Sequence, residues 1–204
     1  MIKIKDLTVK NFMSVGNVTQ AVDFNKEQLT LVLGENLDQG GDDTGSRNGT
    51  GKTTIINALS YALYGQALTN IKRNNLINKT NSKGMLVTLN FDKDGNSYRI
   101  ERGRSPNVLK FYINNHEQVD ANIDESQGDS RETQKSIAEL LDMSHDMFKH
   151  IVALNTYTEP FLSMRANDQR AVINSYLVLL SLLKKPNYLK KKQNKQKILL
   201  QKKH

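Results

Sequence analysis

The segment NGTGKTT at residues 48–54 restricts the possible folds of this chain more than any other stretch. It follows the short apolar run LTLVL at residues 29–33 and leads directly into TTIINALSYALYG, which has apolar residues at helical spacing. A buried strand, a glycine-rich turn and a helix, in this order, form the context in which backbone N–H groups wrap a phosphate. The sequence therefore predicts a phosphate-binding loop at the start of a helix.

Each residue type in this loop suits phosphate binding. Glycine permits positive φ where the chain turns, lysine reaches the β- and γ-phosphates, and a hydroxyl binds Mg²⁺. The N-terminus of the following helix adds a partial positive charge. We therefore predict a site for ATP and Mg²⁺, with Thr53 as a metal ligand. The predicted nucleotide-binding residues of the loop are Asn48, Gly49, Thr50, Gly51, Lys52, Thr53 and Thr54.

One glycine of the pattern G-x-x-x-x-G-K-[ST] is missing, because Ser46 stands five residues before Gly51. Ser46 can take that position at a cost of about 1 kcal/mol if its φ is positive. Alternatively, Gly34 closes the preceding strand, and the turn-forming residues ENLDQGGDDTGS bulge out before the chain returns to the loop. We favour the bulge, which adds Gly34 to the predicted nucleotide-binding residues. A glycine-rich hairpin without a ligand is the plainer alternative.

Composition excludes several other kinds of site. A chain of 204 residues allows one domain with an appendage, and the absence of cysteine excludes disulfides and thiolate metal sites within it. The four histidines show no metal-ligand spacing. No signal peptide is recognisable, and no segment approaches the roughly 20 apolar residues of a membrane span. We therefore expect a cytoplasmic protein with no membrane partner, in the host cytoplasm if a phage encodes it.

The net charge of +8 is concentrated at one end of the sequence. Residues 184–204 carry nine lysines and no acidic residue, which leaves 20 basic and 21 acidic residues in 1–183. The net charge of that larger part is therefore −1. Any basic surface on it is expected to be a local patch rather than a field over the whole molecule.

Hydrophobic periodicity outlines the elements and the domains. Period-two alternation predicts strands at residues 2–9, 21–24, 85–91, 97–102 and 108–113, the last three in an antiparallel meander with a turn at DKDGN. Helices are predicted at 53–64 and 129–143, a helix passing into a strand at 146–154, and a further helix toward residue 173. The predicted domains are a head at 1–172 (nucleotide-binding core 1–66, meander 67–125, helical region 126–172) and a basic tail at 173–204.

In this order the motifs resemble the SbcC-like and SMC-like ATPases that repair DNA double-strand breaks, and within them the branch that serves bacteriophage recombination endonucleases. IKIKDLTVKNFMSVGN looks like the opening strand pair, and NGTGKTTIINALSYALYG is similar to the Walker A motif and its helix. MLVTLNFDKDGNSYRIERGR looks like the family's hairpin, and residues 147–173 look like the Q-loop region that leads into a coiled coil. The resemblance covers residues 1 to about 173.

The resemblance implies a fold and further site residues. The implied fold is α/β, a P-loop NTPase of the ABC-ATPase head type (lobe I), with a mixed sheet, an antiparallel meander and flanking helices. Asn11 and Ser14 would lie on the adenosine side, although Met13 replaces the usual basic residue beside them. Asn155 stands where the family has its Q-loop glutamine, and it would join Thr53 at Mg²⁺ or face the attacking water.

The function implied is the ATP-binding lobe of a DNA recombination and double-strand-break repair ATPase that works with a nuclease subunit. DNA and a second ATPase head, joined through ATP, would be further partners. The LSGG signature, Walker B and the catalytic glutamate of the family have no counterpart in this sequence, so whether the chain alone is an ATPase stays open and turnover should be poor. Alternatives are a nucleotide-dependent DNA-binding or assembly module without turnover, and a small-molecule P-loop phosphotransferase.

Two groups of basic residues have alternative interpretations. Lys72, Arg73, Arg99, Arg102 and Arg104 either contact DNA phosphates or are solvated charges at a hairpin edge. The tail from residue 173 is either a genuine basic segment or an out-of-frame remnant of the coiled-coil start. The second hypothesis comes from the genetic code. Residues 176–180 can be encoded by a nucleotide sequence that gives Leu-Gly-Ile-Thr when it is read one base earlier. The family has a similar sequence at the start of its coiled coil.

Overall fold

The structure is a computed structural model that describes residues 2–26, 28–35, 49–118, 129–154 and 159–183. The chain divides into two compact units, Met1–Leu141 and Asp142–His204. The first contains the sheet, the phosphate loop and two longer helices, and the second contains short helical turns and one longer helix.

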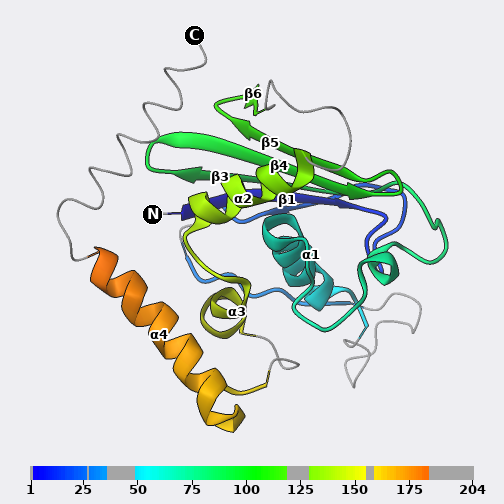
Figure 1. The fold of residues 1–204 in the computed structure, drawn as a ribbon. Coiled ribbons are helices and arrows are strands. Elements are labelled where there is room, and N and C mark those ends of the chain that lie inside the picture. The colour runs from blue at the N-terminus through cyan, green and yellow to red at the C-terminus, as the bar shows by residue number, and fades with distance from the viewer. Residues whose placement is uncertain (1, 27, 36–48, 119–128, 155–158, 184–204) are drawn as a thin grey trace. The chain divides into compact units, whose positions relative to one another are not determined.

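A six-stranded sheet with the order β2-β1-β3-β4-β5-β6 forms the frame of the first unit (Figure 1). Every pair of neighbouring strands is antiparallel. The strands are β1 (Ile2–Lys10), β2 (Gln20–Asp23), β3 (Met85–Lys93), β4 (Asn96–Arg104), β5 (Val108–Ile113) and β6 (His116–Glu117).

Alternation in the sequence decides which face of the sheet is buried. In β3 the side chains of Val87, Leu89 and Phe91 are each at most 1% exposed, whereas the residues between them are polar and partly exposed. Rings from three neighbouring strands continue this layer: Phe91 and Tyr98 have centroids 5.2 Å apart, and Tyr98 and Phe111 5.9 Å. One face is therefore apolar core, as a half-buried antiparallel sheet requires.

Two helices cover the apolar face of the sheet. Helix α1 (Lys52–Tyr64) packs against β3 and β4 and buries Ala58, Leu59 and Ala62. Helix α2 (Asp129–Leu141) lies beside α1 and packs against β5 with Ile137 buried. A short 3₁₀ turn, η2 (Arg73–Leu76), follows α1 and leads toward β3. These contacts fix α1, and with it the phosphate loop, against the sheet.

The second unit begins with a short helix, α3 (His145–Met147), which continues into a π-helical turn, η3 (Phe148–Val152). The hydroxyl of Ser144 caps α3 by accepting a hydrogen bond from the backbone N–H of Met147 at 3.1 Å. The 3₁₀ turn η4 (Phe161–Ser163) and the helix α4 (Ala166–Leu183) follow. Helix α3 packs against α4 within this unit.

The predicted strands at 2–9 and in the meander and the predicted helix at 53–64 are confirmed. Gly65 ends α1 in the left-handed conformation, with φ 69°, and its N–H donates to the carbonyl of Tyr61 at 2.8 Å. The turn at DKDGN is also present, with Asp94 and Gly95 at positive φ between β3 and β4.

The prediction of a buried strand at 29–33 is wrong for this structure. The segment has no regular secondary structure, and Leu29, Leu31 and Leu33 are 102%, 79% and 67% exposed. A strand buried on both faces needs other elements packed on both faces of its sheet. This segment is paired with none of the six described strands and lies in no such layer.

The prediction that residues 146–154 pass from helix into strand is half right. The helical part is present as α3 and η3, but Ala153 and Leu154, the last described residues before a gap, are not in a strand. The π turn ends at Ala153, whose φ and ψ of −102° and 58° lie outside the strand region. Helix α4 runs through residue 173 without a break, so the head-to-tail boundary at 172/173 stays a prediction.

Candidate nucleotide-binding site

The phosphate loop turns into α1 through two glycines in left-handed conformations. Gly49 has a φ of 80° and Gly51, the N-cap of α1, a φ of 89°. Residues with a Cβ rarely adopt these angles, so glycine is the natural choice at both positions. No side chain caps the helix, and its first turn contains no acidic residue. The first N–H groups of α1 and its positive dipole end are therefore directed toward the loop.

Gly34 lies directly against this loop although 16 positions separate it from Thr50. A Cβ added to Gly34 would stand 1.8 Å from the Oγ1 of Thr50 and 3.0 Å from the Nζ of Lys52. Only glycine fits such a close approach. Gly34, before the segment 36–48, therefore lies against Thr50 and Lys52, which follow that segment. The bulge hypothesis predicts this close approach. Ser46, the alternative, lies outside the described residues.

The side chains of the loop offer the groups that a nucleotide needs. The Nζ of Lys52 donates to the Oγ1 of Thr50 at 3.1 Å, which holds the ammonium over the loop. Thr53 is exposed in the first turn of α1, whereas Thr54 beside it is only 6% exposed. The two threonines thus differ in role: the hydroxyl of Thr53 is accessible to a metal ion, and that of Thr54 points into the protein.

Ser14 comes from the turn after β1 and meets the same loop. Its Oγ lies 2.9 Å from the Oγ1 of Thr54, and it would be 3.5 Å from a Cβ on Gly51. Asn11 is brought nearby but is 3% exposed, and its amide contacts the carbonyls of Lys83 and Gly84. Ser14 is therefore placed beside the phosphate loop, whereas Asn11 is part of the scaffold around it.

Two predicted site residues, Asn48 and Asn155, lie outside the described residues. Among the described residues, no group of three His, Asp or Glu side chains is arranged to hold a metal ion. Two Mg²⁺ ligands, Thr53 and Asn155, were predicted from the sequence. Of these, only Thr53 lies in the described part of the chain.

Buried polar residues on α1 that the sequence analysis missed hold the helix in place. The Oδ1 of Asn57 accepts from the N–H of Leu68 at 2.9 Å, and its Nδ2 donates to the carbonyl of Thr53 at 3.1 Å. The hydroxyl of Ser60 donates to the carbonyl of Gln66 at 2.8 Å. Polar residues on the apolar side of a helix are a signal for such tethers.

The arginines proposed for DNA contact fall into different environments. Arg102 is 8% exposed, and burial lowers its pKa to about 10. Its Nε donates to the carbonyl of Ala62 at 3.0 Å and its Nη2 to the Oε1 of Gln134 at 2.6 Å. Arg99 lies on the other face of the sheet, with its guanidinium 4.0 Å from the ring centre of Tyr112. Arg102 is therefore a structural residue rather than a surface cation.

The remaining cations gather where η2 meets the end of β4. The Nε of Arg104 donates to the Oδ1 of Asn74 at 2.6 Å, and Lys72 and Arg73 are exposed on the same turn. Burial raises the pKa of Tyr61, and the charges of Arg102, Arg104 and Arg73 oppose that rise. No ion pair between described residues involves Lys72, Arg73 or Arg104.

The sequence carries a signal for this basic edge. Residues 44–91 contain no aspartate or glutamate, and neither do residues 102–116. The two acid-free segments meet at the basic edge, where the N–H of Gly84 donates to the carbonyl of Ser105 at 2.8 Å. Neither of these two segments contributes a carboxylate to the basic edge.

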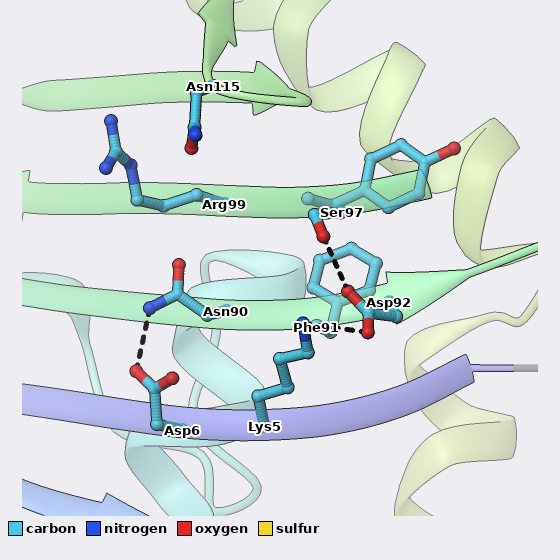
Figure 2. A pocket seen from close by; sticks show the side chains of 9 residues that line it. Lys5, Asp6, Asn90, Phe91, Asp92, Ser97, Arg99 and Asn115 are labelled. Atoms are coloured by element: carbon cyan, nitrogen blue, oxygen red, sulfur yellow. Dashed lines mark hydrogen bonds and ion pairs between the residues drawn. The ribbon is translucent and has the colours of Figure 1, made fainter. Parts of the chain in front are cut away.

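A shallow hollow of about 220 Å³ lies on the polar face of the sheet, lined by residues of β1, β3 and β4 (Figure 2). Its polar groups have partners within the protein: the Nζ of Lys5 is 2.8 Å from the Oδ2 of Asp92, Asn90 donates to Asp6 at 2.7 Å, and Arg99 pairs with Glu101 at 3.2 Å. The Lys5 hydrogen bond is the first cause of a lowered pKa at Asp92. Polar groups satisfied in this way do not indicate a ligand site.

Comparisons with known proteins relate the chain to a domain family and to named relatives. A family described as AAA domain matches residues 6–204. The chain is 33% identical over 177 residues to Exonuclease subunit 2 of Enterobacteria phage T4, and 24% identical over 177 residues to the DNA double-strand break repair Rad50 ATPase of Methanococcus maripaludis. These similarities confirm the resemblance to repair ATPases stated from the sequence. The first alignment covers 86% of this chain and 28% of the phage protein, and the second 85% and 15%.

The chain therefore spans less than a third of the length of these relatives. A solved structure of the Smc head domain with an extended coiled coil, bound to the C-terminal domain of ScpA and derived from Pyrococcus furiosus, overlaps with a TM-score of 0.45 and 19% identity. That overlap covers 72% of this chain and 35% of the other, and it is too weak to support a structural conclusion. Among the described helices, none combines the length and apolar composition needed to cross a membrane.

Proposed function

The chain belongs to the AAA domain family, and on that premise we propose that it is the ATP-binding lobe of a DNA recombination and double-strand-break repair ATPase that works with a nuclease subunit. The fold class predicted from the sequence, a P-loop NTPase head with an antiparallel meander and flanking helices, agrees with this family and with the described sheet. ATP and Mg²⁺ are the proposed cofactors.

The observation that carries the proposal is the approach of Gly34 to the phosphate loop. A nucleotide site needs a loop that closes tightly around a phosphate, with lysine and hydroxyl at its end. Gly34, Lys52 and Thr53 meet these needs within one small volume, at the uncapped N-terminus of α1. A glycine-rich hairpin without a ligand gives no reason for this convergence.

The proposed roles follow from the chemistry of each residue. The backbone N–H groups of Gly49, Thr50 and Gly51 would bind the phosphates, and the ammonium of Lys52 would neutralise the β- and γ-phosphate charge. Thr53 would be a ligand of Mg²⁺, which screens the remaining phosphate charge when bound. Ser14 would border the site on the adenosine side. Asn48 would bind nucleotide as part of the loop, and Asn155 would join Thr53 at Mg²⁺ or face the attacking water.

The nuclease partner is proposed from the names of the relatives, since one is called an exonuclease subunit and another a double-strand break repair ATPase. A second ATPase head joined through ATP belongs to the same proposal. Because this sequence lacks the LSGG, Walker B and catalytic glutamate groups, we propose that the chain alone binds ATP and turns it over slowly. A cytoplasmic location, in the host cell if a phage encodes the chain, stays part of the proposal.

DNA is the proposed macromolecular partner, and the basic edge formed by Lys72, Arg73 and Arg104 is the proposed surface for its phosphates. Two of these side chains are exposed, and no described carboxylate pairs with any of the three. Arginine and lysine in such a setting can exchange counterions for DNA phosphates. Arg102 no longer belongs to this group, because its guanidinium is used within the core.

A nucleotide-dependent assembly module without turnover stays the main alternative, because the same phosphate loop would serve it. A small-molecule phosphotransferase is disfavoured, because an antiparallel meander follows α1 where such an enzyme needs an acceptor pocket with a base and lid arginines. Heads that dimerise with ATP but show no hydrolysis on adding the nuclease partner would favour the assembly module.

Binding of Mg-ATP to the full chain, measured by calorimetry, tests the proposal. We expect saturable binding by the wild type and its loss in Lys52→Ala, because the ammonium makes the main charge contact with the phosphates. Lys79→Ala is a matched control, since Lys79 is exposed and outside the loop. A wild type that does not bind Mg-ATP, or a Lys52→Ala variant that binds it as well as the control, would contradict the proposal.

A further inference from the structure

We infer that Asn78, on the segment between α1 and β3, is a positioning residue of the nucleotide site and acts through Ser14. Asn78 is 26 residues beyond Lys52 and belongs to no recognised motif of the loop. The inference rests on the proposed function, because it concerns how the ATP site is held in shape. It adds a second segment of the chain, residues 76–84, to the construction of that site.

The turn after β1 contains two residues other than glycine in the left-handed region. Asn11 and Met13 both have a φ of 50°, a conformation that asparagine adopts more readily than methionine. Two backbone hydrogen bonds close the turn internally, from Asn11 N–H to the Gly16 carbonyl and from Val15 N–H to the Phe12 carbonyl, each at 2.9 Å. A turn with two such residues persists only when its surroundings hold it.

The segment at residues 76–84 supplies that support along the backbone. The N–H of Met13 donates to the carbonyl of Leu76 at 2.7 Å, and the N–H of Asn78 donates to the carbonyl of Asn11 at 2.9 Å. Phe12, which is fully buried, forms a β-bridge with Ile77. The turn after β1 is therefore paired with this segment on both sides of Phe12.

The side chain of Asn78 completes the connection. Its Nδ2 donates to the carbonyl of Met13 at 3.0 Å, and its Oδ1 accepts from the N–H groups of Thr80 and Asn81, each at 3.1 Å. The residue is 9% exposed. The oxygen of this amide thus accepts hydrogen bonds within its own turn, and the nitrogen donates to the carbonyl of Met13. This combination needs a donor and an acceptor on the same side chain.

Asn81 and Asn11 fix the other end of the same frame. The Nδ2 of Asn81 donates to the Oδ1 of Asn11 at 2.7 Å, and the Nδ2 of Asn11 donates to the carbonyl of Lys83 at 2.9 Å. Asn11 is buried. The amide of Asn11 therefore links the turn to the segment before β3.

The Met13 carbonyl belongs to the peptide bond that leads into Ser14. A carbonyl held at this point restricts the direction in which the next residue leaves the turn. Ser14 then places its hydroxyl 2.9 Å from Thr54 and against Gly51. The chain of contacts therefore runs from the Asn78 amide through the Met13 carbonyl and Ser14 to the first turn of α1, where the phosphates are proposed to bind.

Asn78→Ser in the full chain is the variant that tests this. A serine hydroxyl can accept from the N–H groups two and three residues on, so the local turn is kept, but it does not reach the Met13 carbonyl. Asn78→Asp keeps the shape and turns the contact with Met13 into a repulsion between two oxygens. Asn75→Ser is the control, because Asn75 is exposed on η2 and makes no described side-chain hydrogen bond.

We expect the Kd for Mg-ATP to rise about fivefold in Asn78→Ser, the loss corresponding to one hydrogen bond, and further in Asn78→Asp. Asn75→Ser should leave it unchanged. In a Ser14→Ala background, Asn78→Ser should add less than about a twofold loss, because Asn78 acts through Ser14. Urea denaturation checks that each variant is folded at the assay condition.

Two results would overturn the inference while the proposed function stands. In one, wild type and Asn78→Ser bind Mg-ATP equally well. In the other, Asn78→Ser weakens binding by the same factor with and without Ser14, which indicates a general effect on the fold. A wild-type chain that binds no Mg-ATP overturns the proposed function itself and the inference with it.

Discussion

Replacing Gly65 by alanine tests how firmly the buried guanidinium of Arg102 is held. Gly65 ends α1 with a φ of 69°, and a Cβ at this position would lie 2.9 Å from the Nη1 of Arg102 and 3.5 Å from its Cζ. The guanidinium is pinned by hydrogen bonds to the carbonyl of Ala62 and to Gln134. Gln134 in turn donates to the carbonyl of Leu63 at 3.4 Å, so helix α2 shares the same contacts.

The expected cost has two parts. A left-handed φ on alanine costs about 1 kcal/mol. A hydrogen bond from a charged donor is worth about 2 kcal/mol, and the new methyl group must displace the guanidinium from at least one of them. We therefore expect Gly65→Ala to lower the free energy of unfolding by about 3 kcal/mol, which is a large part of the stability of a domain of this size.

Urea denaturation of the full chain, followed by circular dichroism, measures this value. Gly95→Ala is the matched control: Gly95 has a φ of 83°, and a Cβ there would meet nothing within 4 Å, so only the backbone cost of about 1 kcal/mol should appear. In an Arg102→Met background, the cost of Gly65→Ala should fall to the same level. Equal costs for Gly65→Ala and Gly95→Ala would refute the reasoning, because they would mean that Arg102 moves aside freely.

Two further predictions concern charge. The double substitution Arg73→Glu and Arg104→Glu should weaken duplex DNA binding at least about tenfold in fluorescence anisotropy and reduce its salt dependence, whereas Lys26→Glu should have a smaller effect; equal effects would speak against the basic edge. Lys5 lowers the pKa of Asp92, so the folded state favours the carboxylate. The resulting stabilisation is present above the ordinary pKa of 3.8, and it is lost as the pH falls through the pKa that Asp92 has in the folded state. Asp92→Asn should remove about 0.5 kcal/mol at pH 7, discounted for partial exposure, and the difference from wild type should vanish at low pH in urea titrations; a difference independent of pH would contradict this.

Local patterns predicted the elements that depend on local chemistry. Alternation along β3 and β4, the Asp94-Gly95 turn between them and the stop of α1 at Gly65 each follow from short-range rules of burial and backbone conformation. The phosphate loop was predicted for the same reason, because its residue types lie within seven consecutive positions. The role of Gly34 cannot be predicted from the loop residues alone. It depends on a long insertion whose two ends lie close together in the fold.

Long-range contacts explain the failures. The apolar run at 29–33 has strand-like composition, but a strand also needs partners, and local sequence does not say which strands will pair with it. The sequence around Arg102 does not distinguish it from a surface cation, because its partners lie on α1 and α2. The sequence gives no sign of the role of Asn78, because its partner, the carbonyl of Met13, lies 65 positions away.

The pairing of β1 with β3 sets the order in which this unit can assemble. Leu7 pairs with Leu89 and Thr8 with Thr88, so the chain that joins them, including the phosphate loop and α1, forms one loop of about 80 residues. The hairpins from β3 to β5 have short connections and can form first. The pairing of β1 with β3 requires closure of the loop of about 80 residues and is therefore expected to be slower. A ribosome delivers the phosphate loop well before β3. The nascent loop therefore precedes the sheet, and a chain released before residue 85 would carry the complete loop sequence without β3, against which α1 packs.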